Sequence, residues 1–308
     1  MNVLSLFDGM SCGQIALQKL GIKVNNYFAS EVDKYAIKVS SENFPNTIHL
    51  GDVTKIDFKA LPKIDLLIGG SPCQGFSFAG KQLNFNDPRS ALFFEFVRAL
   101  RETNPKYFML ENVVMKQEHQ DVISEHLGVK PIFINSSLLS AQNRKRLYWT
   151  NIPIEPIEDK KIVLADIIED GLVDRDKSYC IDANYFKGTN LEQYLTKKRR
   201  QIVFEKSDKP IRLGAITKSM GNRVYHEAGK SICLSALGGG WGAKTGLYHD
   251  DYCIRKLTVL ECKRLQTVPD DYLMNVSNSQ AYKMLGNGWT VDVIIHILGG
   301  LKNDYSIK

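Results

Sequence analysis

Residues 2–21, "NVLSLFDGMSCGQIALQKLG", decide the fold. The segment opens on a short apolar run, "NVLSLF", turns through the glycine-containing "DGMSCG", and continues into "QIALQKLG", where apolar residues recur at helical spacing. A strand that leads through a turn into a helix is the opening of a βα unit, the building block of α/β folds.

The same alternation continues to residue 150. We expect further strands at 25–32, 64–69 and 106–113, and helices at 33–44 and 90–103. Apolar strands separated by amphipathic helices indicate a parallel sheet covered on both faces, so we predict an α/β fold with a doubly wound, Rossmann-like sheet. Ligands bind such sheets at the carboxyl ends of the strands. The unusual residues of this half lie there: Asp8, Gly9, Glu31, Asp52, Cys73 and Glu111.

The pattern changes after residue 150. The stretch 151–161, "NIPIEPIEDKK", contains two prolines and a charge cluster, which is typical of a domain boundary. The next hundred residues are polar, glycine-rich and weakly periodic, before helical patterns return at 258–266 and 291–301. We predict a catalytic domain at 1–155, a smaller, mainly irregular and β domain at 156–275, and a segment at 276–308 that returns to the first domain.

The composition is that of a soluble globular protein, with 308 residues, 44% of them hydrophobic and 24% charged. The net charge of +6 favours a polyanionic partner only weakly. Without a run of about 18 apolar residues or a signal peptide, we expect no membrane span and a cytoplasmic location. The six cysteines form no C-x-x-C pair, so we expect reduced thiols and no metal site.

The first turn and two acidic residues form a candidate nucleotide site. Backbone amides at a glycine-containing turn can approach such a ligand, and Glu31 follows a strand where a ribose hydroxyl needs an acceptor. Asp52, in "LGDV", is a second candidate acceptor. An ordinary βα turn with a surface glutamate explains the same residues, and because G-x-G-x-x-G is absent, dinucleotide binding is not indicated.

Cys73, within "GGSPCQGFSFAG" at 69–80, is the candidate nucleophile. A thiol with a pKa of about 8.5 is already partly thiolate at neutral pH, and the thiolate is a strong nucleophile. Free cysteines more often serve as small buried hydrophobes, which is our interpretation of the other five. Beside Cys73, glycine, proline, glutamine and serine favour a residue presented to a substrate.

Two further stretches carry candidate catalytic groups. Glu111 follows the strand "KYFML", and a carboxylic acid there, with its pKa raised by burial, could give a proton to a ring nitrogen. In "QNRKRLYW", Arg144 and Arg146 alternate, so an extended chain would point both guanidinium groups the same way, toward a phosphate or a base oxygen. A solvated glutamate and a solvated basic strand remain the alternatives.

Taken together, these motifs resemble those of the cytosine-5 DNA methyltransferases. The resemblance covers nearly the whole chain in the order of that family. Its elements are "FDGMSCG" for the cofactor turn, "GGSPCQGFS" for the catalytic loop, "ENV" for the glutamate motif, "QNRKRLYW" for Q-x-R-x-R, "RKLTVLECKRLQTVPDDY", and the closing "SQAYKMLGNGWTVDVIIHI". The first half is also similar to the de novo branch of the family.

The resemblance implies a mechanism. Cys73 would add to carbon-6 of a cytosine flipped out of duplex DNA, and Glu111 would hold or protonate nitrogen-3 of the ring. Arg146 would contact the base, and Arg144 would organise a loop or bind a phosphate. The methyl group would come from S-adenosyl-L-methionine (AdoMet), which leaves as S-adenosyl-L-homocysteine.

The resemblance also assigns binding residues. Those implied for AdoMet are Phe7, Asp8, Gly9, Gly13, Glu31, Val32, Asp52, Val53, Pro72, Asn287 and Gly288; the family more often has serine at the last position. Those implied for DNA are Gln74, Ser77, Met220, Arg223, Gly239 and Lys244. The region around Met220 and Arg223 resembles that of the GCGC-specific HhaI-type enzymes, but a methionine replaces their gap-filling glutamine.

We therefore expect a DNA (cytosine-5-)-methyltransferase of bacterial or phage type, acting on double-stranded DNA as a monomer. The sequence specifies neither the target site nor a companion restriction endonuclease. Three alternatives stay open: the RNA-modifying branch of the same family, a silent DNA- or AdoMet-binding regulator, and an NAD-dependent oxidoreductase. The long region between "QNRKRLYW" and "RKLTVLECKRLQ", glycine-rich in its second half, argues against the first. Intact Cys73 and Glu111 argue against the second, and the missing glycine fingerprint argues against the third.

Overall fold

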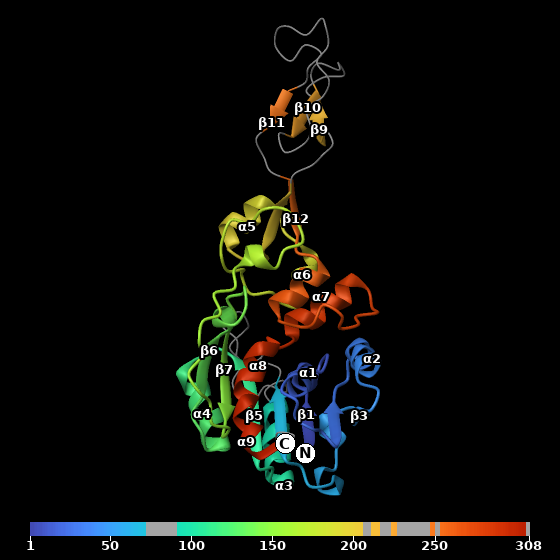
Figure 1. Cartoon of the computed structure of the whole chain (residues 1–308), viewed down its shortest axis with the longest axis vertical. Coiled ribbons are helices and arrows are strands. Elements are labelled where there is room, and N and C mark those ends of the chain that lie inside the picture. The colour runs from blue at the N-terminus through green and yellow to red at the C-terminus, as the bar shows by residue number, and fades with distance from the viewer. Residues whose placement is uncertain (72–90, 206–210, 216–222, 227–246, 250–252, 306–308) are drawn as a thin grey trace, which may run out of the picture.

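The computed structural model describes residues 1–71, 91–205, 211–215, 223–226, 247–249 and 253–305. Figure 1 shows a large sheet with helices at one end of the molecule, and α6 (Val259–Leu265) and α7 (Asn278–Asn287) next to it. Short strands lie farther along the long axis.

The large sheet has seven strands in the order β3-β2-β1-β4-β5-β7-β6. Pairing is parallel from β3 to β5, whereas β7 is antiparallel to both β5 and β6. The strands are β1 (Asn2–Leu6), β2 (Asn26–Ser30), β3 (Ile48–His49), β4 (Leu66–Gly70), β5 (Tyr107–Val113), β6 (Ile132–Asn135) and β7 (Lys145–Thr150). The predicted α/β fold is confirmed. The antiparallel β7 differs from the all-parallel expectation because residues 136–144 are too few for a crossover helix.

Helices cover both faces of this sheet. They are α1 (Cys12–Lys19), α2 (Lys34–Asn43), α3 (Ala91–Thr103), α4 (Gln117–Leu127) and α8 (Val291–Leu298), with α9 (Lys302–Tyr305) at the end of the described chain. Val3, Ile68 and Met109 enter one hydrophobic cluster with residues of α1 and α8, while Leu4 and Leu67 enter a second with residues of α3 and α4. Because neighbouring residues of a strand point to opposite faces, β1, β2, β4, β5 and β7 each supply residues to both clusters.

Local signals set several helix ends. Asp33 precedes α2, and its carboxylate accepts the amide of Tyr35 at 3.0 Å. Thr258 and Glu261 form a capping box at the start of α6. Gly128, with φ 71°, ends α4 in the left-handed conformation that glycine adopts without strain. Short 3-10 turns complete the connections: η1 (Val53–Lys55), η2 (Phe58–Ala60), η3 (Ser136–Leu138), η4 (Leu164–Asp166), η5 (Tyr185–Lys187) and η7 (Gly299–Leu301).

Within its described residues, the second half contributes two small sheets. In one, β8 (Ile202–Glu205) pairs antiparallel with β12 (Cys253–Lys256), and α5 (Leu191–Lys197) lies nearby in Figure 1. The other consists of β9 (Ile211–Ala215), β10 (Arg223–His226) and β11 (Leu247–His249), with β10 in the middle. The chain then returns, through α6 and α7, to pack α8 against α1. The division into domains at 155 and 275 stays a prediction.

Among the described residues, the segment from Asn278 to Leu301 is long and apolar enough to cross a membrane by length and composition alone. However, 61% of its apolar window is buried inside the protein. Residues 288–290 also separate α7 from α8 within it. These features are those of a core segment of a globular protein.

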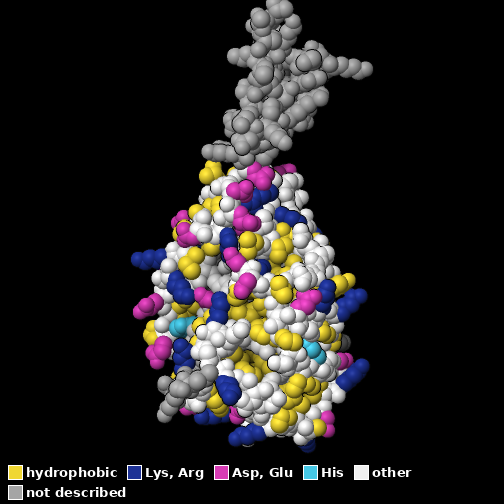
Figure 2. Space-filling view, turned by 45° about the vertical axis from the view of Figure 1, so that its right-hand side comes forward, with side chains coloured by type: hydrophobic (Ala, Val, Ile, Leu, Met, Phe, Trp, Pro, Cys, Tyr) yellow, Lys and Arg dark blue, Asp and Glu magenta, His cyan; other side chains and the backbone are white. Residues whose placement is uncertain are grey.

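Charged side chains of both signs are interspersed over the described residues on the face shown in Figure 2. Large apolar side chains also reach the surface, including Val32, which is 71% exposed, and Phe133, which is 54% exposed. The net charge is therefore not gathered in one basic patch on this face. Surface charge on this face therefore does not locate the functional site, which has to be found from the geometry of individual side chains.

Candidate active site

The turn between β1 and α1 has an unusual backbone. Phe7, Gly9 and Ser11 all have φ near +58°, at 58°, 58° and 59°. Glycine adopts this left-handed region freely, but phenylalanine and serine do so only where the surroundings enforce it. Space is open at Gly9, where an added Cβ would meet nothing within 4 Å. The turn is therefore shaped to leave its outer side free for a ligand.

Asp8 enforces that shape from inside. Its carboxylate accepts the hydroxyls of Ser5 at 2.6 Å and Tyr27 at 2.8 Å, and also that of Ser11. Burial raises the pKa of Asp8, although these three hydroxyl contacts act in the opposite direction. The structure thus places this sequence-predicted cofactor residue within the turn, with both oxygens engaged by protein groups.

Glu31 lies against the same turn, as the sequence predicted. One carboxylate oxygen accepts the amide of Gly9 at 2.8 Å, and the other accepts the amides of Val32 at 2.7 Å and Asp33 at 2.8 Å. Val32 exposes its side chain beside this carboxylate. The carboxyl end of β2 therefore presents an oriented acceptor and an apolar surface next to the open turn.

Asp52 lies one strand away. Oδ1 of Asp52 accepts the amide of Thr54 at 3.0 Å and its hydroxyl at 2.9 Å. The hydroxyl of Ser30 donates to the carbonyl of Gly51 at 2.7 Å, which joins this loop to β2. Val53 begins η1 and is buried. Of the two, Asp52 has the side chain that can reach a ligand.

Gly13 and Gly288 close the inner end of the turn. A Cβ at Gly13 would lie 2.3 Å from Cδ1 of Ile68, so any side chain there would displace the end of Ile68. A Cβ at Gly288 would lie 3.1 Å from the carbonyl oxygen of Met284 and 3.3 Å from Sγ of Cys12. Asn287, the last residue of α7, is exposed. The segment after α7 thus approaches the first turn, as the resemblance implied.

Glu111 is a buried carboxylate held by two donors. It lies in β5, opposite Gly70 of β4 and Tyr148 of β7. Nε of Arg146 is 2.8 Å from Oε1 of Glu111, and the indole nitrogen of Trp289 donates to Oε2 at 3.2 Å. The resemblance implied that Glu111 and Arg146 both act on the base, but it did not predict their ion pair, and the tryptophan was not singled out.

Arg144, two residues before Arg146, has a different set of partners. It is 4% exposed and donates to the carbonyl oxygens of Ile181 at 3.0 Å, Gly286 at 3.1 Å and Gly288 at 2.8 Å, and to Sγ of Cys180 at 3.4 Å. Its guanidinium thus joins residues 180–181 to the end of α7 and to Gly288 after it. Of the two roles proposed for it, this geometry favours loop organisation over phosphate binding.

Comparison with known proteins decides the family. The family model for C-5 cytosine-specific DNA methylases matches residues 1–303. The chain belongs to this family. It is 32% identical to the Type II methyltransferase M.HhaI of Haemophilus parahaemolyticus, covering 100% of this chain and 96% of the relative. It is also 32% identical to the Type II methyltransferase M.NgoBI of Neisseria gonorrhoeae, covering 95% and 90%.

Solved structures agree on the fold. The Entamoeba histolytica methyltransferase EhMeth superposes with a TM-score of 0.68 at 16% identity, covering 99% of this chain and 98% of that one. The S. pombe Dnmt2 methyltransferase gives a TM-score of 0.60 at 16% identity, covering 98% and 99%. At such identities the likeness concerns the fold of this C-5 methylase alone.

Two buried glutamines support the site and were not predicted as site residues. The side-chain oxygen of Gln142 accepts the amide of Ile181 at 2.8 Å. The side-chain amide of Gln266 donates to the carbonyls of Leu285 at 2.6 Å and Gly288 at 3.1 Å. Both belong to quoted motifs of the methylase, "QNRKR" and "RLQ", so the motif match was the signal that could have found them.

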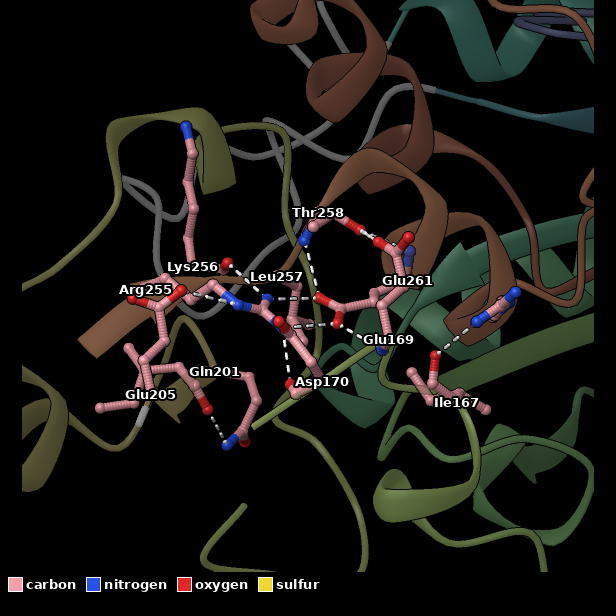
Figure 3. Close-up of polar contacts among 12 residues, drawn as sticks. Ile167, Glu169, Asp170, Gln201, Glu205, Arg255, Lys256, Leu257, Thr258 and Glu261 are labelled. Carbon is pink, nitrogen blue, oxygen red and sulfur yellow. Dashed lines mark hydrogen bonds and ion pairs between the residues drawn. The ribbon is translucent and has the colours of Figure 1, made fainter. Parts of the chain in front are cut away.

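Figure 3 shows how the strand β12 is joined to α6 in this methylase. Arg255 forms ion pairs with Glu261 at 2.8 Å, Asp170 at 2.7 Å and Glu205 at 3.2 Å. The side chain of Glu261 is 0% exposed. The guanidinium of Arg255, in β12, thus contacts α6 through Glu261 and β8 through Glu205. It also contacts the loop that contains Asp170.

Several predicted residues lie outside the described part of the chain: Pro72, Cys73, Gln74, Ser77, Met220, Gly239 and Lys244. Arg223 is the first residue of β10, and the description there is confined to the backbone. Among the described cysteines, Cys12 and Cys262 are buried, as expected for structural thiols, whereas Cys180 is only partly buried. Burial raises the pKa of Cys12 to about 12, which keeps its thiol protonated.

Proposed function

We propose that this C-5 methylase transfers a methyl group from AdoMet to carbon-5 of a cytosine turned out of duplex DNA, through a covalent adduct of Cys73. The observation that carries the proposal is Glu111, a buried carboxylate held on both oxygens at the carboxyl end of the sheet. The neighbouring strand β4 ends at Gly70, three positions before Cys73 in the sequence.

These residues supply what cytosine chemistry needs. A thiolate of Cys73 that bonds to carbon-6 opens the 5,6 double bond and moves its electrons through carbon-4 to nitrogen-3, where the Glu111 carboxyl can give a proton. The resulting enamine has a nucleophilic carbon-5. Once carbon-5 carries the methyl group, nitrogen-3 returns its proton to Glu111. Loss of the carbon-5 proton to a base, with cleavage of the sulfur–carbon bond, then restores the aromatic ring and the thiolate.

AdoMet fits the residues of the first turn. When bound, it supplies the electrophilic methyl group. We propose that Glu31 accepts the ribose hydroxyls, the open side of Gly9 admits the ligand, and Val32 contacts the adenine. Among the described residues, the ammonium of Lys55, at 3.9 Å, is the one charged group near Oδ2 of Asp52, and we propose that this oxygen accepts the adenine amino group.

Duplex DNA is the substrate that fits the length of the second half. A base inside the helix cannot reach Glu111, so it must be extruded, at a cost of a few kcal/mol. We further propose that the polar region at 156–275 reads the target sequence, and that the protein acts as a cytoplasmic monomer without a metal. The Type II names of the relatives favour a role in restriction–modification.

The decisive experiment is bisulfite sequencing of DNA from cells that express the chain. We expect 5-methylcytosine at one short recurring sequence, and none with Cys73→Ala, whose affinity for DNA should be retained. A covalent, Cys73-dependent adduct on 5-fluorocytosine DNA would separate an active enzyme from a silent regulator. Methyl transfer onto tRNA, with none onto DNA, would contradict the proposal and place the chain in the RNA-modifying branch.

A further inference from the structure

Trp289 lies in the three-residue break between α7 and α8 and is 8% exposed. Its indole nitrogen donates to Oε2 of Glu111 at 3.2 Å, across 178 positions of sequence. Arg146 contacts the other oxygen of the same carboxylate. An aromatic residue in an apolar segment is usually core packing, but this one aims its single polar atom at the candidate catalytic acid.

Glycines make room for this ring. A Cβ at Gly70 would lie 3.0 Å from the indole nitrogen of Trp289 and 3.1 Å from Oε2 of Glu111. A Cβ at Gly13 would lie 3.6 Å from Cζ3 of the same ring. The indole therefore lies across the ends of β4 and β5, with its far edge near the first turn of α1. It touches both halves of the site, the catalytic carboxylate and the cofactor turn.

The backbone on both sides of Trp289 is fixed by buried polar groups. The carbonyl of Gly288 accepts Arg144 at 2.8 Å and Gln266 at 3.1 Å. The hydroxyl of Thr290 donates to the side-chain oxygen of Gln266 at 2.8 Å. A buried network of this kind holds one conformation because breaking any member leaves the others unpaired. The direction of the indole N–H is therefore set by the surrounding fold.

We propose that Trp289 is a positioning residue that fixes the carboxyl group of Glu111 for the base. This proposal rests on the function proposed for Glu111. With the indole N–H on Oε2 and Arg146 on Oε1, the carboxyl plane cannot rotate about its terminal bond. Each carboxyl oxygen of Glu111 has two lone pairs. Each oxygen can therefore contact its donor and still hold the proton that Glu111 shares with nitrogen-3 of the cytosine.

The test replaces the donor and keeps an aromatic ring. Trp289→Phe should lower kcat for DNA methylation about ten-fold or more, because a misoriented acid forfeits transition-state stabilisation. The KM values for AdoMet and DNA should stay within about two-fold of the wild type, since no ligand contact is removed. The matched control is Trp149→Phe, because the buried indole of Trp149 donates to Ser124 at 2.9 Å. The control should lose stability with kcat retained.

A double-mutant cycle identifies the route of the effect. If Trp289 acts through Glu111, Trp289→Phe should cost less than about two-fold in kcat once Glu111→Gln is present. Additive losses in kcat would overturn the positioning role. It would also be overturned if Trp289→Phe had the kcat of the wild type while Glu111→Gln had a lowered kcat. A wild-type chain that methylates nothing would instead refute the proposed function itself.

A second variant tests the proposal if Trp289→Phe does not fold. If Trp289→Phe does not give a cooperative thermal transition, benzothienylalanine incorporated at position 289 keeps the bicyclic shape and replaces the N–H with sulfur. The same fall in kcat at unchanged KM supports the proposal. A kcat equal to that of the wild type overturns it.

Discussion

The guanidinium of Arg144 donates to the carbonyl oxygen of Gly288 at 2.8 Å, across 144 positions of sequence. It also donates to Gly286 at 3.1 Å and Ile181 at 3.0 Å. Three backbone carbonyls from two distant segments are therefore satisfied by one buried cation. This contact attaches the segment after α7 to the start of β7, and with it the residues that border both the cofactor turn and Glu111.

Replacing Arg144 with lysine tests this attachment. A single ammonium group cannot reach carbonyls that a planar guanidinium contacts with two nitrogens, so at least one buried oxygen loses its donor. We expect Arg144→Lys to cost about 1–3 kcal/mol of folding free energy, and to weaken AdoMet binding. Thermal unfolding and calorimetric titration measure the two effects. Arg175→Lys, which alters a half-buried arginine outside the site, should lower stability only; an equal loss of AdoMet affinity there would contradict the assignment.

Gly288 and Cys12 should behave as a pair. Because a Cβ at position 288 would lie 3.3 Å from Sγ of Cys12 and 3.1 Å from the carbonyl of Met284, Gly288→Ser crowds both atoms. We expect Gly288→Ser to destabilise the protein by about 1–3 kcal/mol. Adding Cys12→Ala removes one of the crowded atoms and should recover about 1 kcal/mol beyond additivity. Thermal unfolding of the four proteins measures this coupling, and strictly additive effects would refute it.

Asp8 predicts a specific pH dependence. Burial raises the pKa of Asp8 above its ordinary value of 3.8, and the nearby Glu31 acts in the same direction. A raised pKa in the folded state contributes stability below 3.8 that is lost as the pH rises through the folded-state pKa. Asp8→Asn carries no such proton. Its melting temperature, relative to the wild type, should therefore rise with pH from about 4 and then level off.

The control for this prediction is Asp8→Ala. Removing the carboxyl leaves the hydroxyls of Ser5, Ser11 and Tyr27 without their acceptor, so this variant should be less stable than the wild type at every pH. A gap between Asp8→Asn and wild type that does not change with pH would show that Asp8 stays ionised in the folded protein.

A substitution at Arg255 should affect DNA binding and AdoMet binding to different extents. Arg255→Met leaves the fully buried Glu261 without its cation, which is expected to cost about 3–5 kcal/mol. The contacts to Asp170 and Glu205 are lost with it, so β8 and the loop at Asp170 lose the ion pairs that join them, through Arg255, to α6. We expect DNA affinity to fall much more than AdoMet affinity, measured by fluorescence anisotropy and calorimetry. Adding Glu261→Gln should restore part of the stability; no recovery would contradict this account.

Much of the sheet could be predicted from the sequence because its strands are apolar runs. The segment predicted at 33–44 is the helix Lys34–Asn43, and the one at 90–103 is Ala91–Thr103. The two-residue strand β3 is too short to give a pattern. The direction of β7 depends on the length of the preceding connection rather than on its own residues, so periodicity could not reveal it.

Site residues could be predicted where they belong to a recognised motif. They were harder to predict where their role depends on a contact between residues far apart in the sequence. Glu31 lies beside Gly9, as the cofactor motifs indicated, and Glu111 and Arg146, which the resemblance assigned to the same base, form an ion pair. Trp289 was not predicted as a site residue, because an indole in an apolar segment has the pattern of core packing. Its partner, Glu111, also lies far away in the sequence. For the same reason Gln142 and Gln266 were not recognised as supports.

The packing of α8 on α1 has a consequence for synthesis. A ribosome releases the first turn and Glu111 well before Trp289, which lies 178 positions after Glu111. Until translation reaches Gly288 and Trp289, the first turn lacks this neighbouring segment, and the glutamate lacks its indole donor. The arrangement of side chains around Glu111 therefore forms only after translation has passed position 289.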